Sequence, residues 1–212
     1  MAKFNRGILG GFQGKLGTVI GTRWRGINVM RAVPEKVSNP NTIKQRIQRE
    51  RFKLIAELMK KARPMIELGF ERTGRPTRSA TNEAMSWNVK YGVTGEYPGQ
   101  VLDFAQLRFA FGTLEGVGSQ QVAANEGALT FNWTNNSGFM NAKGDDELFV
   151  ILYNEDKKEF LNHYSVATRE AGTAILTLPE SHQGSEFHVW TFMHNSERNL
   201  SSTSVYLGKV TP

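Results

Sequence analysis

Arginine and tryptophan stand side by side at one point of the chain, in Arg23-Trp24-Arg25. A guanidinium can grip a phosphate and an aromatic ring can stack on a base, so contact of this triplet with nucleic acid is one interpretation. Large aromatic side chains are, however, usually mostly buried. This favours the other interpretation, a plain basic hairpin with Trp24 packed beneath it.

Four further cations fall on one side of a predicted helix. Asn41 or Thr42 can cap its first turn, and apolar residues then recur at helical spacing at Ile43, Ile47, Leu54, Ile55, Leu58 and Ala62. The cations on the opposite side are Arg46, Arg49, Lys53 and Lys60. This stripe is either a solvated face or, together with the hairpin triplet, a surface for an anionic partner. Arg51 points toward the apolar side and would need a partner there.

The residue types that usually carry catalysis are scarce or badly spaced. The chain has no Cys, so disulfides, thiolate metal sites and thiol nucleophiles are excluded. None of the His residues has the helical spacing of a metal site. His188 and His194 could share a strand face but would then lie about 20 Å apart. We therefore predict no catalytic residue, no cofactor and no metal, and hence no enzyme.

Two segments look like ligand-binding loops but depart from them. The acidic cluster Asp145-Asp146-Glu147 lacks the spaced oxygen ligands of an EF-hand, which favours a solvated turn. In the glycine-rich start of the chain, Gly14-Lys15 is followed by Leu16 instead of Ser or Thr, so the Walker pattern is not met. The glycines favour close approach of backbone segments instead.

These candidate residues need an α+β N-terminal region to position them. The β-rich runs Thr18–Trp24 and Ile27–Val33 enclose a short turn and predict a hairpin. Pro64 breaks or kinks the long helix, and a shorter helix follows over Asn82–Lys90. Alternating apolar residues predict a strand over Val101–Leu114.

From Gly116 the pattern changes to short strands separated by turns. Seven runs at intervals of about ten residues are typical of a β-sandwich of the immunoglobulin or fibronectin type III kind. They are Gln120–Ala124, Ala128–Thr134, Glu147–Asn154, Glu159–Ala167, Thr173–Leu178, Glu186–His194 and Thr203–Val210. Apolar residues on both faces of the sixth run place it at the centre of a sheet. The sequence thus predicts an α+β N-terminal domain over residues 1–115 and an all-β sandwich over residues 116–212.

Charge is divided unevenly along the chain. The 212 residues hold 26 Lys and Arg against 20 Asp and Glu, a net charge of +6. Residues 1–100 hold 19 against 7, a net +12, whereas residues 101–212 hold 7 against 13, a net −6. Either the basic half meets an anionic partner, or the two halves meet each other or neighbouring copies. Charges that merely solvate each half are the third interpretation.

Two resemblances add to these patterns. The segments Leu129–Trp133, Ala174–Pro179 and Phe187–Phe192 resemble the B, E and F strands of a fibronectin type III domain. Five motifs, Gly14-Lys15-Leu16-Gly17, Asn39-Pro40-Asn41-Thr42, Leu68-Gly69-Phe70, Phe131-Asn132-Trp133-Thr134 and Val205-Tyr206-Leu207-Gly208, carry a second one over nearly the full length. With them the chain resembles an uncharacterised protein family found widely in Bacteroidota and their prophages. That resemblance implies a phage association and supplies no mechanism.

Three hypotheses for function follow. The first is a non-enzymatic structural protein of a phage or phage-like particle, whose basic domain anchors to protein partners, among them further copies of the chain, and whose sandwich is displayed. The second is a nucleic-acid-binding protein that uses the basic half. The third is a hydrolase or carbohydrate-binding module, based on exposed aromatics such as Trp190. The start of the chain lacks a signal peptide and no apolar run approaches about 18 residues, so we expect cytoplasmic synthesis and no membrane partner.

Overall fold

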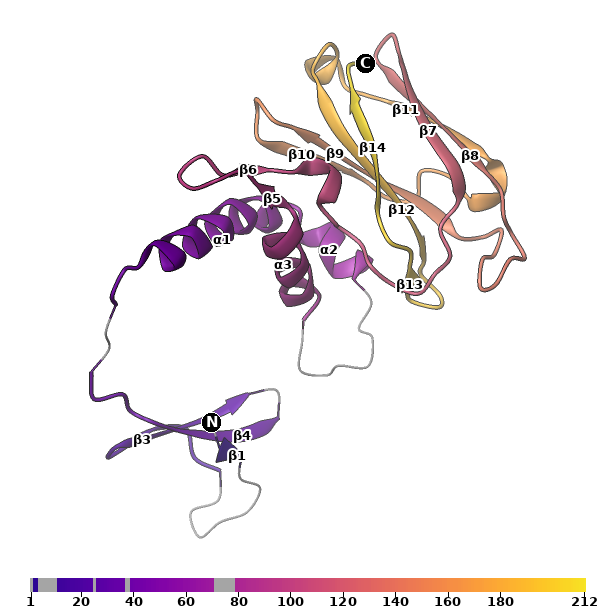
Figure 1. The fold of residues 1–212 in the computed structure, drawn as a ribbon. Coiled ribbons are helices and arrows are strands. Elements are labelled where there is room, and N and C mark those ends of the chain that lie inside the picture. Colours follow the sequence, from indigo (N-terminus) through magenta and orange to yellow (C-terminus); the bar gives the residue numbers. More distant parts are fainter. Residues whose placement is uncertain (1, 4–10, 25, 37–38, 71–78) are drawn as a thin grey trace. The chain divides into compact units, whose positions relative to one another are not determined.

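The computed structural model of the chain describes residues 2–3, 11–24, 26–36, 39–70 and 79–212. The chain divides into two compact units, residues 1–43 and 44–212, and each is described by itself. This division does not coincide with the boundary expected between residues 115 and 116. The predicted fold class is confirmed: the three helices lie in the N-terminal half, and the C-terminal part is rich in antiparallel strands (Figure 1).

The N-terminal unit is a small antiparallel sheet. Its strands are β1 (Ala2–Lys3), β2 (Gly14–Leu16), β3 (Val19–Trp24) and β4 (Ile27–Ala32), in the order β1-β4-β3-β2. The pairing of β3 with β4 confirms the predicted hairpin.

Little of this N-terminal sheet is buried. The ring of Phe12 covers Gly21 so closely that a Cβ there would lie 2.5 Å from it, which accounts for one glycine of the glycine-rich segment. Among the described residues 11–36, Val29 is the only buried apolar side chain. The described part of this unit therefore has almost no core of its own.

The second unit begins with three helices, α1 (Ile43–Lys61), α2 (Arg63–Gly69) and α3 (Ala80–Tyr91). Pro64 lies in the first turn of α2, where its missing N–H costs nothing, and it separates α2 from α1 as predicted. The Ser79 hydroxyl caps α3 by accepting a hydrogen bond of 3.2 Å from the backbone N–H of Asn82. The predicted helix over Asn82–Lys90 is confirmed and is slightly longer than expected.

The segment after α3 differs from the prediction. Only its start forms a strand, β6 (Val101–Leu102), which pairs with β5 (Val93–Thr94). A short 3-10 helix, η1 (Phe104–Gln106), follows. The prediction of one strand over Val101–Leu114 is therefore wrong. Of the alternating apolar residues, Leu107 and Phe109 are buried, whereas Phe111 is 42% exposed. The backbone N–H groups of Phe109 and Ala110 bond to the Ser204 hydroxyl, at 3.0 and 3.3 Å, instead of to a neighbouring strand.

The rest of the unit is a sandwich of two antiparallel sheets. One sheet has the order β11-β8-β7, and the other has the order β10-β9-β12, with β13 and β14 both paired to β12. The bounds are β7 Gly118–Asn125, β8 Ala128–Thr134, β9 Glu147–Asn154, β10 Glu159–His163, β11 Thr173–Thr177, β12 Phe187–Asn195, β13 Leu200–Ser201 and β14 Val205–Val210. All seven predicted strands are present, although the fourth ends at His163 instead of Ala167.

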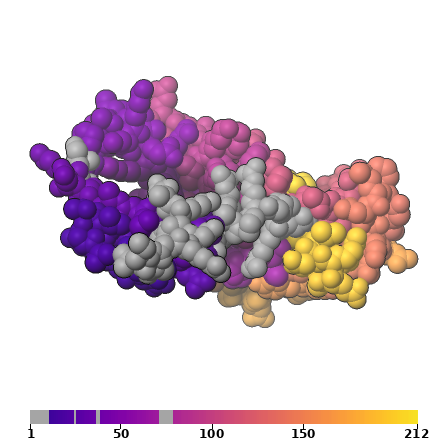
Figure 2. Space-filling model, turned by 90° about the horizontal axis from the view of Figure 1, so that it is seen from below, coloured from indigo at the N-terminus to yellow at the C-terminus, as the bar shows by residue number. Residues whose placement is uncertain are grey.

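Strand β12 links two hydrophobic cores, and all of its residues are buried. Phe187, Val189 and Met193 pack between the two sheets. Trp190 and Phe192 point the other way and pack with α1, α2 and α3. The helices thus cover the outer face of the larger sheet, and the unit has three layers (Figure 1). In the space-filling view, the purple and magenta atoms of the helical segment adjoin the orange and yellow atoms of the strands (Figure 2). The expected central place of the sixth strand is confirmed.

In the part of the chain that the structure describes, no helix combines the length and the apolar character that crossing a membrane requires.

Candidate functional site

The predicted anionic-partner residues are divided between the two units. Arg46, Arg49, Lys53 and Lys60 are exposed along α1. Arg23 and Trp24 end β3 in the N-terminal unit, and Arg25 lies outside the described residues. Trp24 is 47% exposed, so the interpretation that buried it beneath the hairpin is wrong for the described sheet.

A groove between α1 and α3, here called the α1–α3 groove, is the first hollow of interest. Its volume is about 410 Å³, within the range of roughly 300–1,000 Å³ that is typical of ligand pockets. It is lined by Gln48, Arg51, Phe52, Met85, Ser86, Val89 and Lys90. Phe52 remains 54% exposed beside it. The sequence pattern did not predict this groove, because Phe52 lies outside the apolar stripe of α1.

Arg51, which was expected to need a partner on the apolar side of α1, has one in Gln100. With the Gln100 amide oriented so that its oxygen faces α1, that oxygen accepts a hydrogen bond of 3.0 Å from Arg51 Nε. The Gln100 nitrogen then donates to the carbonyl oxygen of Ile47 at 3.2 Å. Arg51 is thereby held at the wall of the groove with its guanidinium bound on one side.

A second hollow, of about 290 Å³, adjoins the groove through Ser86 and Lys90, which line both. In it the guanidinium carbon of Arg108 lies 3.6 Å from the centre of the Trp87 ring, a close cation–aromatic stack. The buried amide of Asn88 holds Arg108 in place by bonding both its N–H and its carbonyl oxygen at 2.8 Å. Burial lowers the pKa of Arg108 from its ordinary value.

The histidines serve packing in the described structure. His188 stacks on Phe104 with ring centres 3.7 Å apart, and its Nδ1 lies 2.8 Å from the Tyr206 hydroxyl. Burial lowers the pKa of His188 and of His163. Across residues 2–3, 11–24, 26–36, 39–70 and 79–212, no three His, Asp or Glu side chains gather as a metal ion would need.

Trp190, on which the carbohydrate-binding hypothesis was based, is fully buried. Its ring packs edge-on to Phe109 with centres 4.8 Å apart. The expectation that Trp190 lies on the surface is therefore wrong. The reason is that both faces of β12 are covered, one by the second sheet and one by the helices.

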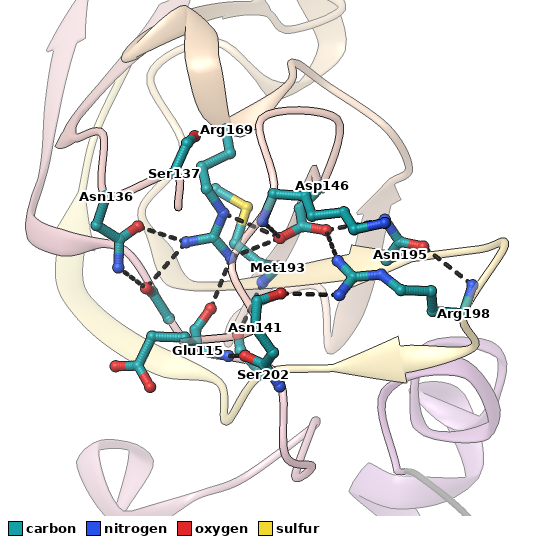
Figure 3. Close-up of polar contacts among 12 residues, drawn as sticks. Glu115, Asn136, Ser137, Asn141, Asp146, Arg169, Met193, Asn195, Arg198 and Ser202 are labelled. Carbon is teal, nitrogen blue, oxygen red and sulfur yellow. Dashed lines mark hydrogen bonds and ion pairs between the residues drawn. The ribbon is translucent and has the colours of Figure 1, made fainter. Parts of the chain in front are cut away.

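The acidic cluster Asp145-Asp146-Glu147 was expected to form a solvated turn. That prediction is wrong for Asp146, which is buried. The Asp146 carboxylate is fully buried and lies 3.0 Å from Arg169 Nη2. Its other oxygen lies 2.5 Å from Arg198 Nη2 and accepts from Asn195 at 2.8 Å (Figure 3). Arg169 donates further to Asn136 and to the carbonyl oxygens of Glu115 and Gly116.

This buried ion-pair network supports the loop between β8 and β9. The Asn136 amide donates to Gly116 O at 2.8 Å, and the Asn141 side chain bonds Glu115 N and Thr113 O at 2.9 and 2.8 Å. Asn141 O in turn accepts from Arg198 at 2.8 Å. The side chains at the tip of the loop, Phe139 and Met140, are 58% and 80% exposed. No periodic pattern marks this loop in the sequence, because its contacts join distant segments.

One protein family, described as a family of unknown function (DUF6266), matches residues 11–208. Among curated proteins, none matches the chain.

Proposed function

The chain belongs to this family of unknown function, and we propose that it is a non-enzymatic assembly protein of a phage or phage-like particle. The N-terminal unit anchors the molecule to its particle, and the sandwich of the second unit is displayed. The resemblance to a family found in Bacteroidota and their prophages supports the phage assignment, and the fibronectin-like strand motifs support a display role.

The observation that carries this proposal is the small buried area of the N-terminal sheet. Its strands are only two to six residues long, and among the described residues 11–36 Val29 is its only buried apolar side chain. Short sheets need a covered apolar face to be stable in water. A partner surface that covers this sheet would supply the missing burial and fix the chain in an assembly.

The charges on this sheet favour an anionic partner surface. Outside β1, the described residues of the unit carry Lys15, Arg23, Arg31 and Lys36 against the single carboxylate of Glu35. Such a positive surface steers an acidic partner toward the sheet and weakens as salt is added. Anchoring therefore combines apolar burial with charge attraction.

The displayed surface is the outer face of the β11-β8-β7 sheet. Its exposed side chains alternate with buried ones, as expected for a sheet with one solvated face. They include Gln121, Ala123, Asn132, Thr173, Ile175 and Thr177. This face is polar apart from the small Ala123 and from Ile175, which is 70% exposed, so it can stay soluble on the outside of a particle.

Co-sedimentation tests the proposal. The tagged full-length chain, produced in the bacterium that releases the particles, should migrate with them in a density gradient. The double variant Arg23→Glu with Arg31→Glu should move to the soluble fractions, because it reverses two charges on the anchoring sheet. The matched control, Lys157→Glu with Lys158→Glu, makes the same charge change at an exposed turn of the second unit and should still co-sediment. Wild-type chain found only in the soluble fractions would reject the proposal.

Nucleic-acid binding is the second candidate, favoured by the exposed Trp24 beside Arg23. Stacking of a base on an aromatic ring contributes roughly 1–3 kcal/mol. Binding of a fluorescent single-stranded oligonucleotide should then fall about tenfold or more in Trp24→Ala and should weaken steeply with salt. Tyr97→Ala, which removes another exposed aromatic, is the control. Equal affinity of both variants would exclude the role of Trp24.

A further inference from the structure

We propose that copies of this chain associate head to tail, with the Phe139–Met140 tip of one copy seated in the α1–α3 groove of the next. This inference rests on the proposed assembly function and names the contact through which copies meet. Because knob and groove are different surfaces, the contact is heterologous, and it generates a ring or an open filament instead of a closed two-fold dimer.

The knob is apolar and strongly exposed. Met140 is 80% and Phe139 is 58% exposed, and the two side chains are neighbours at the tip of one loop. Phenylalanine and methionine are enriched at the cores of protein interfaces, and methionine adapts to irregular pockets. Two such residues side by side form a compact apolar projection.

The loop that carries the knob is fixed before binding. Gly138 N donates to Ala142 O at 2.9 Å, and Ala142 N donates to Phe139 O at 2.9 Å. Beneath the tip, Asn136 and Asn141 are tied to the segment 113–116 and to the Arg169–Asp146–Arg198 network (Figure 3). Burying a pre-ordered loop costs less conformational entropy than burying a flexible one. The large buried network therefore has a use beyond stability, because it presents the knob.

The α1–α3 groove complements the knob in size and in chemistry. Its volume of about 410 Å³ accommodates side chains, and its apolar wall consists of Phe52, Met85 and Val89. Phe52 is 54% exposed, so seating an apolar knob beside it would bury a ring that now faces water. No residue of the groove belongs to the knob loop, so both surfaces of one copy can be engaged at the same time.

The charges around the two surfaces are opposite. Arg51 and Lys90 line the groove, and the adjoining hollow is lined by Arg108 and by one carboxylate, that of Glu83. Beside the knob lie the exposed or partly exposed carboxylates of Glu115, Asp145 and Glu170 and the ammonium of Lys143. The partly exposed guanidinium of Arg198 also bonds this loop, but it is paired with the buried Asp146. Complementary charge sets the orientation of two partners and raises their rate of encounter. The knob therefore enters the groove with its acidic flanks against the basic wall.

Sedimentation of the full-length chain tests the contact. Wild-type protein should form larger species as its concentration rises. The knob variant, Phe139→Ser with Met140→Ser, and the groove variant, Phe52→Glu, should each raise the dissociation constant at least about 30-fold, the effect of losing a central interface residue. Ile175→Ser, which removes an exposed apolar side chain from β11, should associate like the wild type. Unchanged melting temperatures check that each variant folds.

Mixing the two variants gives the decisive result. The knob variant keeps an intact groove and the groove variant keeps an intact knob, so an equimolar mixture should form heterodimers and nothing larger. A wild-type chain that stays monomeric, a groove variant that still associates alone, or a mixture without heterodimers would each overturn the inference. Particle co-sedimentation without self-association would reject this contact only, whereas self-association without co-sedimentation would reject only the proposed function.

Discussion

The carboxylate of Asp146 and the guanidinium of Arg169 form an ion pair at 3.0 Å in which both side chains are fully buried. The partners come from different places, since Asp146 precedes β9 and Arg169 lies in the short 3-10 helix before β11. Asp146 also pairs with Arg198, which follows β12. One carboxylate thus holds together three segments at the same end of the sandwich.

Removing this carboxylate should destabilise the second unit strongly. Asp146→Ala leaves Arg169 buried without its counter-ion, and breaking a buried ion pair from one side costs about 3–5 kcal/mol. The free energy of unfolding, measured with urea by circular dichroism, reports the loss. Asp145→Ala is the matched control, because it removes the neighbouring carboxylate, which is exposed, and should cost about 0.5 kcal/mol or less. Equal losses in both variants would contradict the role of burial.

The shared core of helices and sheet predicts one unfolding transition for residues 44–212. Ile55 on α1 is fully buried in the cluster that includes Phe149 and Trp190. Ile55→Ala should therefore lower the unfolding free energy by about 2–5 kcal/mol, and it should do so equally for helical and strand signals. Lys53→Ala, two positions away and exposed, should change little. Helices that melt before the strands would show that the two layers are independent.

The close contact of α2 with the segment before β7 can be tested at Gly69. A Cβ at Gly69 would lie 2.6 Å from Ala110 Cβ and 2.7 Å from Phe109 O, too close for either to remain in place. We expect Gly69→Ala to cost about 1–3 kcal/mol, the usual cost of overpacking. Gly116→Ala is the control, since nothing lies within 4 Å of the added atom. The melting temperature of each variant, compared with that of the wild type, measures the effect. An unchanged melting temperature in Gly69→Ala would argue against this packing.

The stability of the second unit should fall in mild acid through His188. Burial lowers its pKa, an effect that the Glu155 carboxylate at 3.6 Å only partly offsets. The folded state therefore favours the neutral ring, and the unfolded chain, with a pKa of about 6.5, binds more protons. Stability is complete above that unfolded pKa and declines as pH falls toward the lower folded pKa, by no more than about 1.4 kcal/mol per pH unit for this group.

Unfolding free energies measured between pH 7.5 and about pH 5 check this dependence. His188→Gln should flatten the dependence of the unfolding free energy on pH, because glutamine does not titrate. The control, His182→Gln, removes a histidine whose side chain is more exposed than that of His188, and it should leave most of this dependence in place. An unchanged slope in His188→Gln would assign the acid sensitivity to other groups.

Asn88 offers a test of how the Arg108–Trp87 stack is positioned. Its amide satisfies both backbone groups of Arg108 at 2.8 Å. Asn88→Ala would leave these two partly buried backbone groups unpaired. Because an unsatisfied group costs about 1–3 kcal/mol, the variant should have a lower free energy of unfolding. The fluorescence of Trp87 should shift as the guanidinium leaves its ring. Asn82→Ala, at an exposed position in the same helix, should leave stability and fluorescence nearly unchanged.

Local pattern determined most of the elements. The apolar runs of the sandwich, the helix after Thr42, the break at Pro64 and the central sixth strand were all predicted, because each depends on the spacing of side chains within one short segment. The segment 103–114 was predicted wrongly for the same reason. Its alternation is that of a strand, but its hydrogen-bond partners, Asn88 and Ser204, lie elsewhere in the sequence.

Tertiary structure alone decided which surfaces the elements present. Sequence periodicity shows that a side chain lies on a face, but only packing decides whether that face meets another layer or water. Trp190 is buried because the helices cover the outer face of β12, and Asp146 is buried because Arg169 and Arg198 reach it from distant segments. The same long-range contacts leave Phe52 and the Phe139–Met140 tip exposed. The sequence by itself therefore determined the elements and the uneven charge, whereas the groove, the knob and the buried network depend on contacts between segments far apart in the chain.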